Sequence, residues 1–365
     1  MEHNRKSKVI SIGTAIPTFK YAQADLAGWM HQRLNNQDER LGRKLRILYE
    51  KTSIQYRHSV LPDFGAKNDS PQLFIASDRE PAIEERLAVY KNEAVKLGLS
   101  AANNCLGKTS IQKHDITHLI TVSCTGMSAP GLEIVLKKEL QLSPKTQTHA
   151  VNFIGCYAAF PALKMADAFC KVDPSAKVLI VAVELCTLHF QNKITDDHLL
   201  SNSLFADGAA AALIGNGDNG GKLTIENFSN LLMAEGKNDM AWDIYADGFL
   251  MKLSSYIPQL VDKGIGVLLK ATGVEKENIH HWAIHPGGRK ILEACEKEFE
   301  LRSDDLAASY SVLRNYGNLS APTILFVLEE LLTSKNPKAG ESIFSCGFGP
   351  GLTLESAVFK VAEDA

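Results

Sequence analysis

The chain has 365 residues, of which 45% are hydrophobic and 22% are charged, and its formal net charge is −3. This length allows two domains or one double-sized unit, and the slightly acidic balance excludes the basic footprint of a nucleic-acid-binding protein. No apolar run reaches the length of a membrane span, and the polar N-terminus lacks a signal-peptide pattern. Seven cysteines without paired spacing argue against a disulfide framework or a zinc site, so we expect a reducing, cytoplasmic setting.

Buried strands alternate with helices through the first part of the chain. The patterns predict strands at 8–13, 118–124 and 177–185, and helices at 22–35, 37–50, 82–106 and 131–140. A Pro-, Gly- and Asp-rich stretch at 59–74 is typical of a loop. The alternation predicts an α/β protein with helices on the faces of its sheet.

A Gly- and Asn-rich stretch at 215–222 is the best candidate boundary, and it divides the chain into parts 1–218 and 219–365. A second alternation of elements follows this boundary. It comprises strands at 223–228 and 281–285, helices at 253–272, 288–299 and 320–334, and two C-terminal strands that flank a turn. The two parts therefore follow similar plans.

The stretch 151–172, "VNFIGCYAAFPALKMADAFCKV", places a cysteine between a short apolar strand and an amphipathic helix. Gly155 permits a sharp turn, and Cys156 follows it at the strand-to-helix junction. Free backbone N–H groups at a helix start favour a thiolate, so Cys156 is a candidate nucleophile. The alternative is a small buried cysteine that fills a gap in the core.

Two further polar residues stand at comparable junctions. His285, in "AIHPGG", ends a predicted strand, and Asn318, in "YGNLSAP", precedes a predicted helix. Such positions carry the chemistry in many α/β folds. An imidazole within reach could take the thiol proton, and a carboxamide is a neutral donor suited to an oxyanion.

Three other motifs favour structural interpretations. His280, His281 and His285 are close in sequence, but strand alternation turns His280 to the other face and no carboxylate joins them at ligand spacing. The glycine-rich "GFGPG" at 347–351 lies between two strands, which predicts a hairpin turn rather than a phosphate-binding loop. Asp207 is interpreted as a capping or turn residue before a buried strand.

Taken together, these motifs resemble those of type III polyketide synthases, the chalcone and stilbene synthase family. The matching stretches are "GCYAA" at Cys156, "LFADGAAA" at 204–211, "HPGG" at His285, "YGNLSAP" at Asn318 and "GFGPGLTLE" at 347–355. The resemblance implies a thiolase-like αβαβα fold of two topologically similar halves, assembled as a homodimer. The two halves would correspond to the parts 1–218 and 219–365.

The resemblance also implies the reaction. Cys156 would carry the acyl starter as a thioester, while His285 and Asn318 hold the malonyl-CoA carbonyl during decarboxylation. The extended chain would then cyclise to a pyrone, a resorcinol or a polyhydroxylated aromatic ring. Malonyl-CoA and an acyl-CoA starter would be the substrates, with no metal ion or organic cofactor.

Alignment of these motifs with those of the family implies roles for further residues of this sequence. Phe205 matches a gatekeeping phenylalanine between a CoA tunnel and an inner cavity, and Met251 stands where a second phenylalanine is usual. Trp242 falls where the plant enzymes tend to have glycine. The resemblance further assigns Cys124, His189 and Ser320 to the cavity wall, and Lys51 and Arg57 to the CoA phosphates.

Two other functions remain open at this stage. One is a ketoacyl-ACP synthase III-like condensing enzyme of the same fold, and the other is a non-catalytic thiolase-fold partner subunit. The presence of Cys156, His285 and Asn318 together argues against the second. The acidic stretches "DDH" and "EEL", with no evident basic docking face, argue against an acyl carrier protein as a partner.

Overall fold

The computed structural model describes residues 6–35, 38–65, 71–74, 79–216, 220–237, 239–246, 248–254 and 256–363. Among these residues, no helix is both long and apolar enough to cross a membrane.

Within the described residues, nine strands form one mixed sheet in the order β11-β12-β13-β8-β1-β7-β6-β4-β5. Their bounds are β1 Ser7–Ala15, β4 His118–Ser123, β5 Gln147–Asn152, β6 Lys177–Leu185, β7 Asp207–Asn216, β8 Leu223–Leu232, β11 His281–Ile284, β12 Ser342–Gly349 and β13 Thr353–Val361. Strands β5, β4 and β6 run parallel, while β7 and β1 follow in antiparallel order. Strands β11 and β12 run parallel, while β13 and β8 are antiparallel, so the second half repeats the plan of the first.

The two half-sheets meet through a short antiparallel pairing of β1 with β8, at Lys8–Thr224 and Val9–Leu223. This arrangement confirms the expectation of two topologically similar halves. The boundary expected between 218 and 219 falls on 217–219, which lie outside the described residues.

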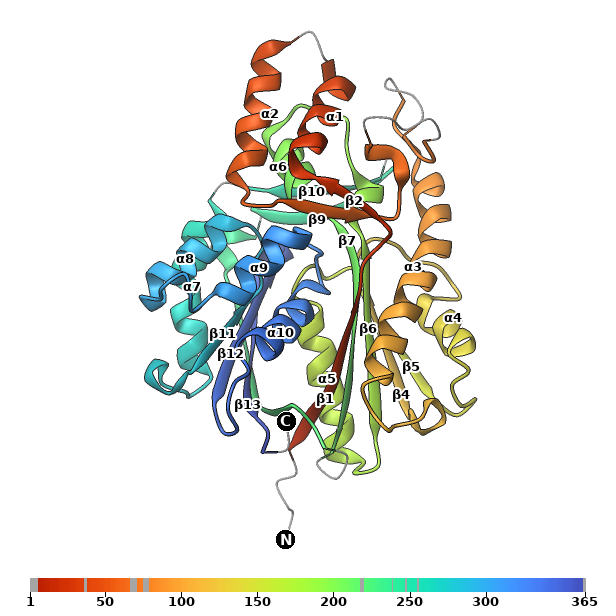
Figure 1. Cartoon of the computed structure of the whole chain (residues 1–365), viewed down its shortest axis with the longest axis vertical. Helices are drawn as coiled ribbons and strands as arrows, with labels where there is room; N and C mark the ends of the chain where they lie inside the picture. Colours follow the sequence, from red (N-terminus) through yellow and green to blue (C-terminus); the bar gives the residue numbers. More distant parts are fainter. Residues whose placement is uncertain are drawn as a thin grey trace.

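Helices form layers inside and outside the two half-sheets (Figure 1). Helices α5 (Ala159–Val172) and α10 (Thr323–Ser334) contact strands of both halves and make the central layer. Seven of the twelve residues of α10 are buried, as expected for a helix packed on both sides. Helices α3 (Ile83–Leu106) and α4 (Leu132–Glu139) cover the first half, and α7 (Ile257–Ala271) with α8 (Arg289–Phe299) covers the second.

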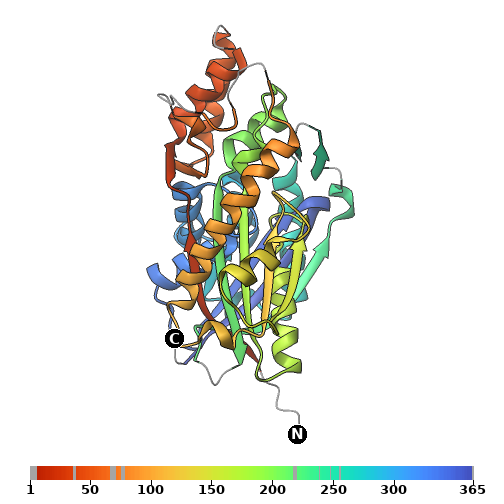
Figure 2. The same ribbon diagram turned by 90° about the vertical axis from the view of Figure 1, so that its right-hand side faces the viewer.

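A smaller group of elements stands above the edge of the sheets where the strands β6 and β11 end (Figures 1 and 2). It comprises α1 Gln23–Asn35, α2 Glu39–Lys51, α6 Asp196–Leu204, the β2–β3 pair (Phe19–Ala22 and Tyr56–Ser59) and the β9–β10 hairpin (Met240–Tyr245 and Gly248–Leu253). Helix α2 starts at Asp38, whose carboxylate accepts hydrogen bonds from the N–H groups of Arg40 and Leu41.

Most elements agree with the sequence prediction to within two residues. The helix predicted to begin at 253 begins at Ile257 instead, because Leu253 still belongs to β10. It also did not anticipate α6, the β9–β10 hairpin or α9 (Ala307–Tyr316). Part of the predicted loop 59–74 forms a short 3-10 turn at Pro62–Phe64, and the segment 66–70 lies outside the described residues.

Candidate functional site

The turn that carries Cys156 lies between the end of β5 and the start of α5, as predicted. Gly155 adopts a left-handed φ of 92°, and a Cβ atom there would lie 2.0 Å from Cδ of Pro350. A Cβ atom on Gly349 would lie 2.3 Å from the ring of Tyr157. The glycines therefore let the "GFGPG" turn between β12 and β13 pack directly on the cysteine turn, which confirms its structural interpretation.

His285 and Asn318 reach the same place from the second half of the chain. The N–H of His285 continues the β11–β12 pairing by donating to the carbonyl of Cys346 at 2.8 Å. Asn318 follows α9 and pairs with the segment around Phe205: its N–H donates to Leu204 and its carbonyl accepts from Ala206, both at 2.9 Å. Two distant parts of the sequence are thus fixed beside each other by main-chain hydrogen bonds.

Cys156, His285 and Asn318 line one cavity, which we call the access tunnel, with a volume of about 220 Å³. Its wall is mostly apolar, with Leu204, Leu253 and Phe348 among its members, and Lys51 and Lys290 are exposed at the other end. The three predicted catalytic side chains are between 1% and 6% exposed. The tunnel therefore leads from basic side chains at the surface to a nearly dry end.

The amide of Asn318 has a defined orientation. Its Oδ1 accepts a hydrogen bond from the N–H of Ser320 at 2.8 Å, and Nδ2 donates to the carbonyl of Gly287 at 3.2 Å. Ser320 adopts a left-handed φ of 57°, which turns its N–H towards the amide oxygen. Because an amide nitrogen has two hydrogens, a second N–H remains for a ligand in the tunnel.

His285 is neutral in this site. Burial lowers its pKa to about 3. Within the described part of the chain, neither ring nitrogen has a hydrogen-bond partner. A neutral imidazole presents one donor and one acceptor, so the ring can both take a proton and hold an oxygen atom.

The predicted thiolate at Cys156 is wrong for the resting site. Burial raises the pKa of the Cys156 thiol to about 12, although the Ser320 hydroxyl and the Asn318 amide act in the opposite direction. The helix start favours a thiolate, but loss of water costs more, since segments remote in sequence close over the sulfur. A neutral thiol and a neutral imidazole therefore line the same end of the tunnel.

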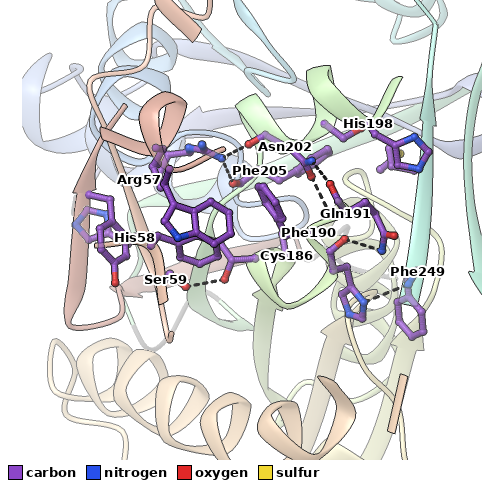
Figure 3. A pocket seen from close by; sticks show the side chains of 18 of the residues that line it. Arg57, His58, Ser59, Cys186, Phe190, Gln191, His198, Asn202, Phe205 and Phe249 are labelled. Carbon is purple, nitrogen blue, oxygen red and sulfur yellow. Dashed lines mark hydrogen bonds between the residues drawn. The ribbon is translucent and has the colours of Figure 1, made fainter. Parts of the chain in front are cut away.

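Phe205 and Met251 separate the access tunnel from a second cavity. Both residues line both spaces, and the second, which we call the inner cavity, has a volume of about 40 Å³ (Figure 3). His189 and Trp242 line the inner cavity, as predicted, together with Cys186. Phe205 and Met251 therefore lie where a gate between the access tunnel and the inner cavity would have to be.

The β9–β10 hairpin is pinned over the inner cavity by aromatic side chains. The indole N–H of Trp242 donates to the carbonyl of Cys124 at 3.0 Å. His189 stacks on Phe249 with ring centroids 4.2 Å apart, and its Nε2 lies 2.6 Å from the carbonyl of Thr125. Burial lowers the pKa of His189 to about 3, so the ring is a neutral donor to that carbonyl.

Cys124 and Ser320 lie behind the cavities and line neither of them. The sulfur of Cys124 accepts a hydrogen bond from the N–H of Gly155 at 3.0 Å. The hydroxyl of Ser320 donates to Glu184 at 3.2 Å. The two residues hold the turn of Cys156 and the loop of Asn318 instead of forming cavity wall.

Glu184 is a buried carboxyl that the sequence analysis did not single out. One oxygen accepts from the N–H of Cys124 at 2.9 Å and from the hydroxyl of Thr125 at 2.8 Å, and the other accepts from Ser320. Burial raises its pKa to about 7. The signal in the sequence was a lone glutamate in the continuous apolar strand "KVLIVAVEL".

Lys51 lies at the outer end of the tunnel. Arg57 does not lie there, so the expected contact of Arg57 with the CoA phosphates is wrong. Arg57 is 5% exposed and faces the inner cavity. Its guanidinium donates to the carbonyls of Asn202 and Phe205 at 2.7 and 2.8 Å (Figure 3). It also donates to the side-chain oxygen of Gln23 at 2.9 Å. Arg57 therefore fixes the main chain of the gate residue Phe205.

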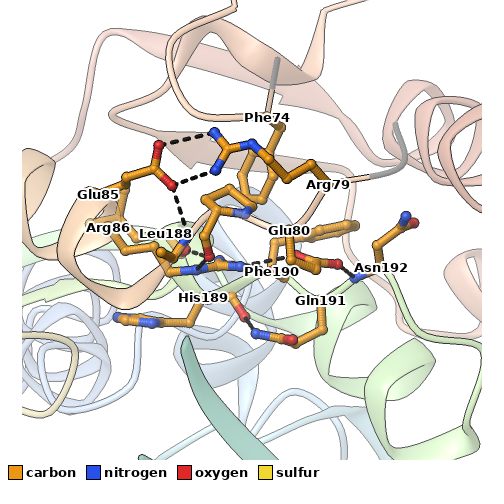
Figure 4. A network of polar contacts seen from close by, with 12 residues as sticks. Phe74, Arg79, Glu80, Glu85, Arg86, Leu188, His189, Phe190, Gln191 and Asn192 are labelled. Carbon is orange, nitrogen blue, oxygen red and sulfur yellow. Dashed lines mark hydrogen bonds and ion pairs between the residues drawn. The ribbon is translucent and has the colours of Figure 1, made fainter. Parts of the chain in front are cut away.

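A second buried arginine holds the wall of the inner cavity from outside (Figure 4). Arg86 donates to the carbonyls of Leu188 and Phe190 and forms an ion pair of 3.0 Å with Glu80. The other oxygen of Glu80 accepts from the N–H of Asn192. The segment 188–192, which carries His189, is thereby clamped on both sides.

The structure agrees with the interpretation of Asp207 as a turn residue before a buried strand. Asp207 opens β7 and accepts from the N–H groups of Val60 and Thr187 and from the Thr187 hydroxyl, at 2.6 to 2.9 Å. Nε2 of His281 contacts Glu341 at 2.7 Å, away from His285. Among the described residues, no group of three or more potential ligands could hold a metal ion.

Comparisons with known proteins match both halves of the chain. Residues 2–218 match the family described as "Chalcone and stilbene synthases, N-terminal domain", and 225–362 match the corresponding C-terminal domain. The chain belongs to the chalcone and stilbene synthase family. It is thus a type III polyketide synthase, an acyltransferase, and the two other functions left open by the sequence are set aside.

Relatives and solved structures agree with this family. The chain is 30% identical over 335 residues to the alpha-pyrone synthesis polyketide synthase-like Pks18 of Mycobacterium tuberculosis, covering 88% of this chain and 83% of the relative. The crystal structure of PKS-I from the brown alga Ectocarpus siliculosus superposes with a TM-score of 0.91 at 26% identity and 99% coverage of both chains. The C-terminal type III domain of Steely1, a type I/III hybrid from Dictyostelium, gives a TM-score of 0.88 at 25% identity, covering 98% and 99% of the two chains.

Proposed function

We propose that Cys156, His285 and Asn318 catalyse decarboxylative condensation of malonyl-CoA onto an acyl starter, and that the products are small pyrones, resorcinols or polyhydroxylated rings. The observation that carries the proposal is that these three side chains share the dry end of one tunnel. A thiol, an imidazole and an amide donor are the groups that acyl transfer and enolate stabilisation require.

Loading of the starter uses the Cys156 thiol and the His285 imidazole together. The starter thioester enters through the access tunnel and Sγ of Cys156 attacks its carbonyl. His285 takes the thiol proton as the new C–S bond forms, and passes it to the CoA thiolate when the old C–S bond breaks. Since both groups are neutral at rest, the charge exists only while the acyl group is transferred.

Decarboxylation uses His285 and Asn318 as donors. The electron pair of the breaking carbon–carboxylate bond moves onto the malonyl thioester, and its carbonyl oxygen becomes an enolate oxygen. An N–H from each residue holds that oxygen, and one such donor is worth about 3 kcal/mol in the transition state. The carbanion then attacks the Cys156 thioester and expels the thiolate, which gives a β-ketoacyl-CoA two carbons longer.

The product class follows from the inner cavity. About 40 Å³ between Trp242, His189 and the gate leaves little room for a bulky aromatic starter carrying three extensions. We therefore propose malonyl or aliphatic acyl starters and short chains. The printed name of the Mycobacterium tuberculosis relative, which refers to alpha-pyrone synthesis, is in keeping with this class.

The chemistry as proposed uses no metal ion or organic cofactor, because loss of CO₂ itself generates the carbon nucleophile. Malonyl-CoA and an acyl-CoA are the proposed substrates, and Lys51 at the tunnel mouth is the proposed contact for a CoA phosphate. We also propose a homodimer in a reducing cytoplasm. All seven cysteines are buried and unpaired, which supports the reducing compartment.

Intact-protein mass spectrometry with a panel of acyl-CoA starters tests the proposal. We expect one acyl group per chain on the wild-type protein, located on Cys156, and none on Cys156→Ala. With malonyl-CoA added, the wild type should release small cyclised polyketides and the variant should form none, a loss above 10³-fold. Cys295→Ala, at a buried cysteine that lines neither cavity, is the matched control. Chain extension by Cys156→Ala would show that another group carries the acyl chain.

A further inference from the structure

One face of α2 forms a basic groove outside the access tunnel. Five cations line this open groove: Arg40, Arg43, Lys44, Lys51 and Lys290. Glu39 and Asp196 are the carboxylates that line it, and Asp196 pairs with Lys44 at 2.6 Å. The groove is therefore positive although the whole chain carries a net charge of −3. This surface corrects the expectation, drawn from the sequence, that no basic docking face exists.

The groove is continuous with the tunnel. Leu48, Lys51, Leu200 and Lys290 line both spaces. A phosphate held by Lys51 and Lys290 would stand at the mouth, with an attached pantetheine arm directed along the apolar wall towards Cys156. Whatever delivers the acyl group must therefore occupy this groove while its arm fills the tunnel.

The basic surface extends along α2 away from the mouth of the tunnel. Arg40 precedes Lys51 by eleven residues, which corresponds to about 16 Å along the axis of α2. Ile47 is 44% exposed between them, and the groove has a volume of about 800 Å³. An exposed apolar side chain surrounded by cations is the composition of a small protein interface, with an apolar centre and a charged rim.

We propose that this groove docks an acidic acyl carrier protein, whose phosphopantetheine-bound acyl chain serves as the starter. The inference rests on the proposed function, since the acyl group must reach Cys156. Carboxylates of the carrier would face Arg40 and Arg43, and an apolar side chain would cover Ile47. The bond from Sγ of Cys156 to the acyl carbon forms, the bond to the pantetheine sulfur breaks, and that sulfur receives the proton of Cys156 through His285.

The experiment compares one acyl chain on two donors. Cys156 acylation is measured with acyl-CoA and with the same acyl group on an acidic carrier protein, at low and high salt. We expect Arg40→Glu/Arg43→Glu to lower kcat/KM for the carrier-bound donor tenfold or more and for acyl-CoA less than threefold. Added salt should slow acylation by the carrier-bound donor to a similar extent and leave acylation by acyl-CoA nearly unchanged, because the contacts with the carrier are exposed charges.

Arg46→Glu is the matched control, because it makes the same charge change on another face of α2. It should leave both donors unaffected. Equal losses for both donors in the double variant would overturn the inference, because the groove would then serve CoA alone. The inference is also overturned if acyl-CoA acylates Cys156 but the carrier-bound donor does not, and the proposed function then stands. If neither donor acylates Cys156, both proposals fail.

Discussion

The access tunnel and the inner cavity meet at Phe205 and Met251, yet they are built in opposite ways. The tunnel is wide and lined by apolar side chains, and its end holds polar groups with free hydrogen-bonding capacity. The inner cavity is small, and two of its polar side chains, His189 and Arg57, are already hydrogen-bonded to main-chain carbonyls. The free polar groups therefore perform the chemistry in the tunnel, whereas the satisfied ones give the inner cavity a fixed shape.

Among changes that leave the inner cavity unaltered, removal of the Asn318 amide at the end of the tunnel should lower the decarboxylation rate most. Asn318→Ala deletes an N–H that we assign to the enolate oxygen, so malonyl-CoA decarboxylation should fall 10²- to 10³-fold. Acylation of Cys156 by the starter should fall less than fivefold, because that step uses His285. The measurements are release of acetyl-CoA and the mass of the acyl-enzyme.

Asn315→Ala is the matched control for Asn318→Ala, since it removes the same group from the nearby helix α9 outside both cavities. Its two rates should equal those of the wild type. If Asn318→Ala loses acylation and decarboxylation to the same extent, Asn318 supports the fold of the loop and is not an enolate donor.

The buried carboxyl behind both cavities should make stability depend on pH. The pKa of Glu184 is about 7 in the folded chain, above its ordinary value of 4.5. Between these values the folded chain holds a proton that the unfolded chain releases, so the contribution of Glu184 to stability is fully present at and below pH 4.5 and is lost as the pH rises to 7. The loss amounts to about 3 kcal/mol.

Glu184→Gln should remove this part of the pH dependence, while its amide oxygen keeps the hydrogen bonds from Cys124 and Thr125 and its NH2 group donates to the Ser320 hydroxyl. Denaturant unfolding at pH 5, 6, 7 and 8 measures it. Burial also raises the pKa of Asp207 to about 6, so a smaller decline that ends near pH 6 should remain in the variant. Glu139→Gln on the surface controls for the loss of one charge. An unchanged slope between pH 6 and 7 in Glu184→Gln would contradict the assignment.

Much of the fold could be predicted because its signals are local. The strand 177–185 is continuously apolar, and the helix beginning near 82 has a regular amphipathic pattern, so β6 and α3 were found within a residue. The β9–β10 hairpin was not predicted, since "MAWDIY" alternates weakly and its partner strand is half-exposed. Its stability comes from Trp242 and Phe249 packing on distant segments, which no local window contains.

The properties of the site also divide into those that the local sequence predicts and those that depend on distant segments. Cys156, His285 and Asn318 were identified by the residues around them, but their ionisation was not, because burial depends on segments far apart in sequence. Arg57 looked like a surface cation, and only the pairing of β2 with β3 turns its side chain inward. The basic face of α2 was visible in the spacing of Arg40, Lys44 and Lys51, which repeat at helical intervals, and could have been predicted.

Changing the shape of the inner cavity should shift products several-fold without loss of decarboxylation. Trp242→Gly removes an indole from the cavity wall and should admit bulkier starters. Met251→Phe places a rigid ring at the gate and should shorten the chain. Liquid chromatography with mass detection gives the product ratios. Efficient formation of a chalcone from 4-coumaroyl-CoA by the unmodified enzyme would contradict the assigned cavity size.

The smallest expected effect is that of pH on the rate of malonyl-CoA decarboxylation, which should hardly change. Malonyl-CoA decarboxylation by Cys156→Ala uses His285 as a hydrogen-bond donor, and the pKa of that ring is lowered to about 3. The ring therefore stays neutral from pH 5.5 to 8, and the rate of acetyl-CoA release should change less than twofold. An ordinary histidine pKa of about 6.5 would instead reduce the neutral fraction about tenfold at pH 5.5. Loading of the wild-type enzyme should also change little over the same range, because the proton passes from the neutral Cys156 thiol to the neutral His285 ring and neither group titrates between pH 5.5 and 8. A tenfold change in the decarboxylation rate between pH 5.5 and 8 would mean that His285 titrates in this range because it is solvated or paired with a carboxylate, and the dry tunnel end would no longer account for its role.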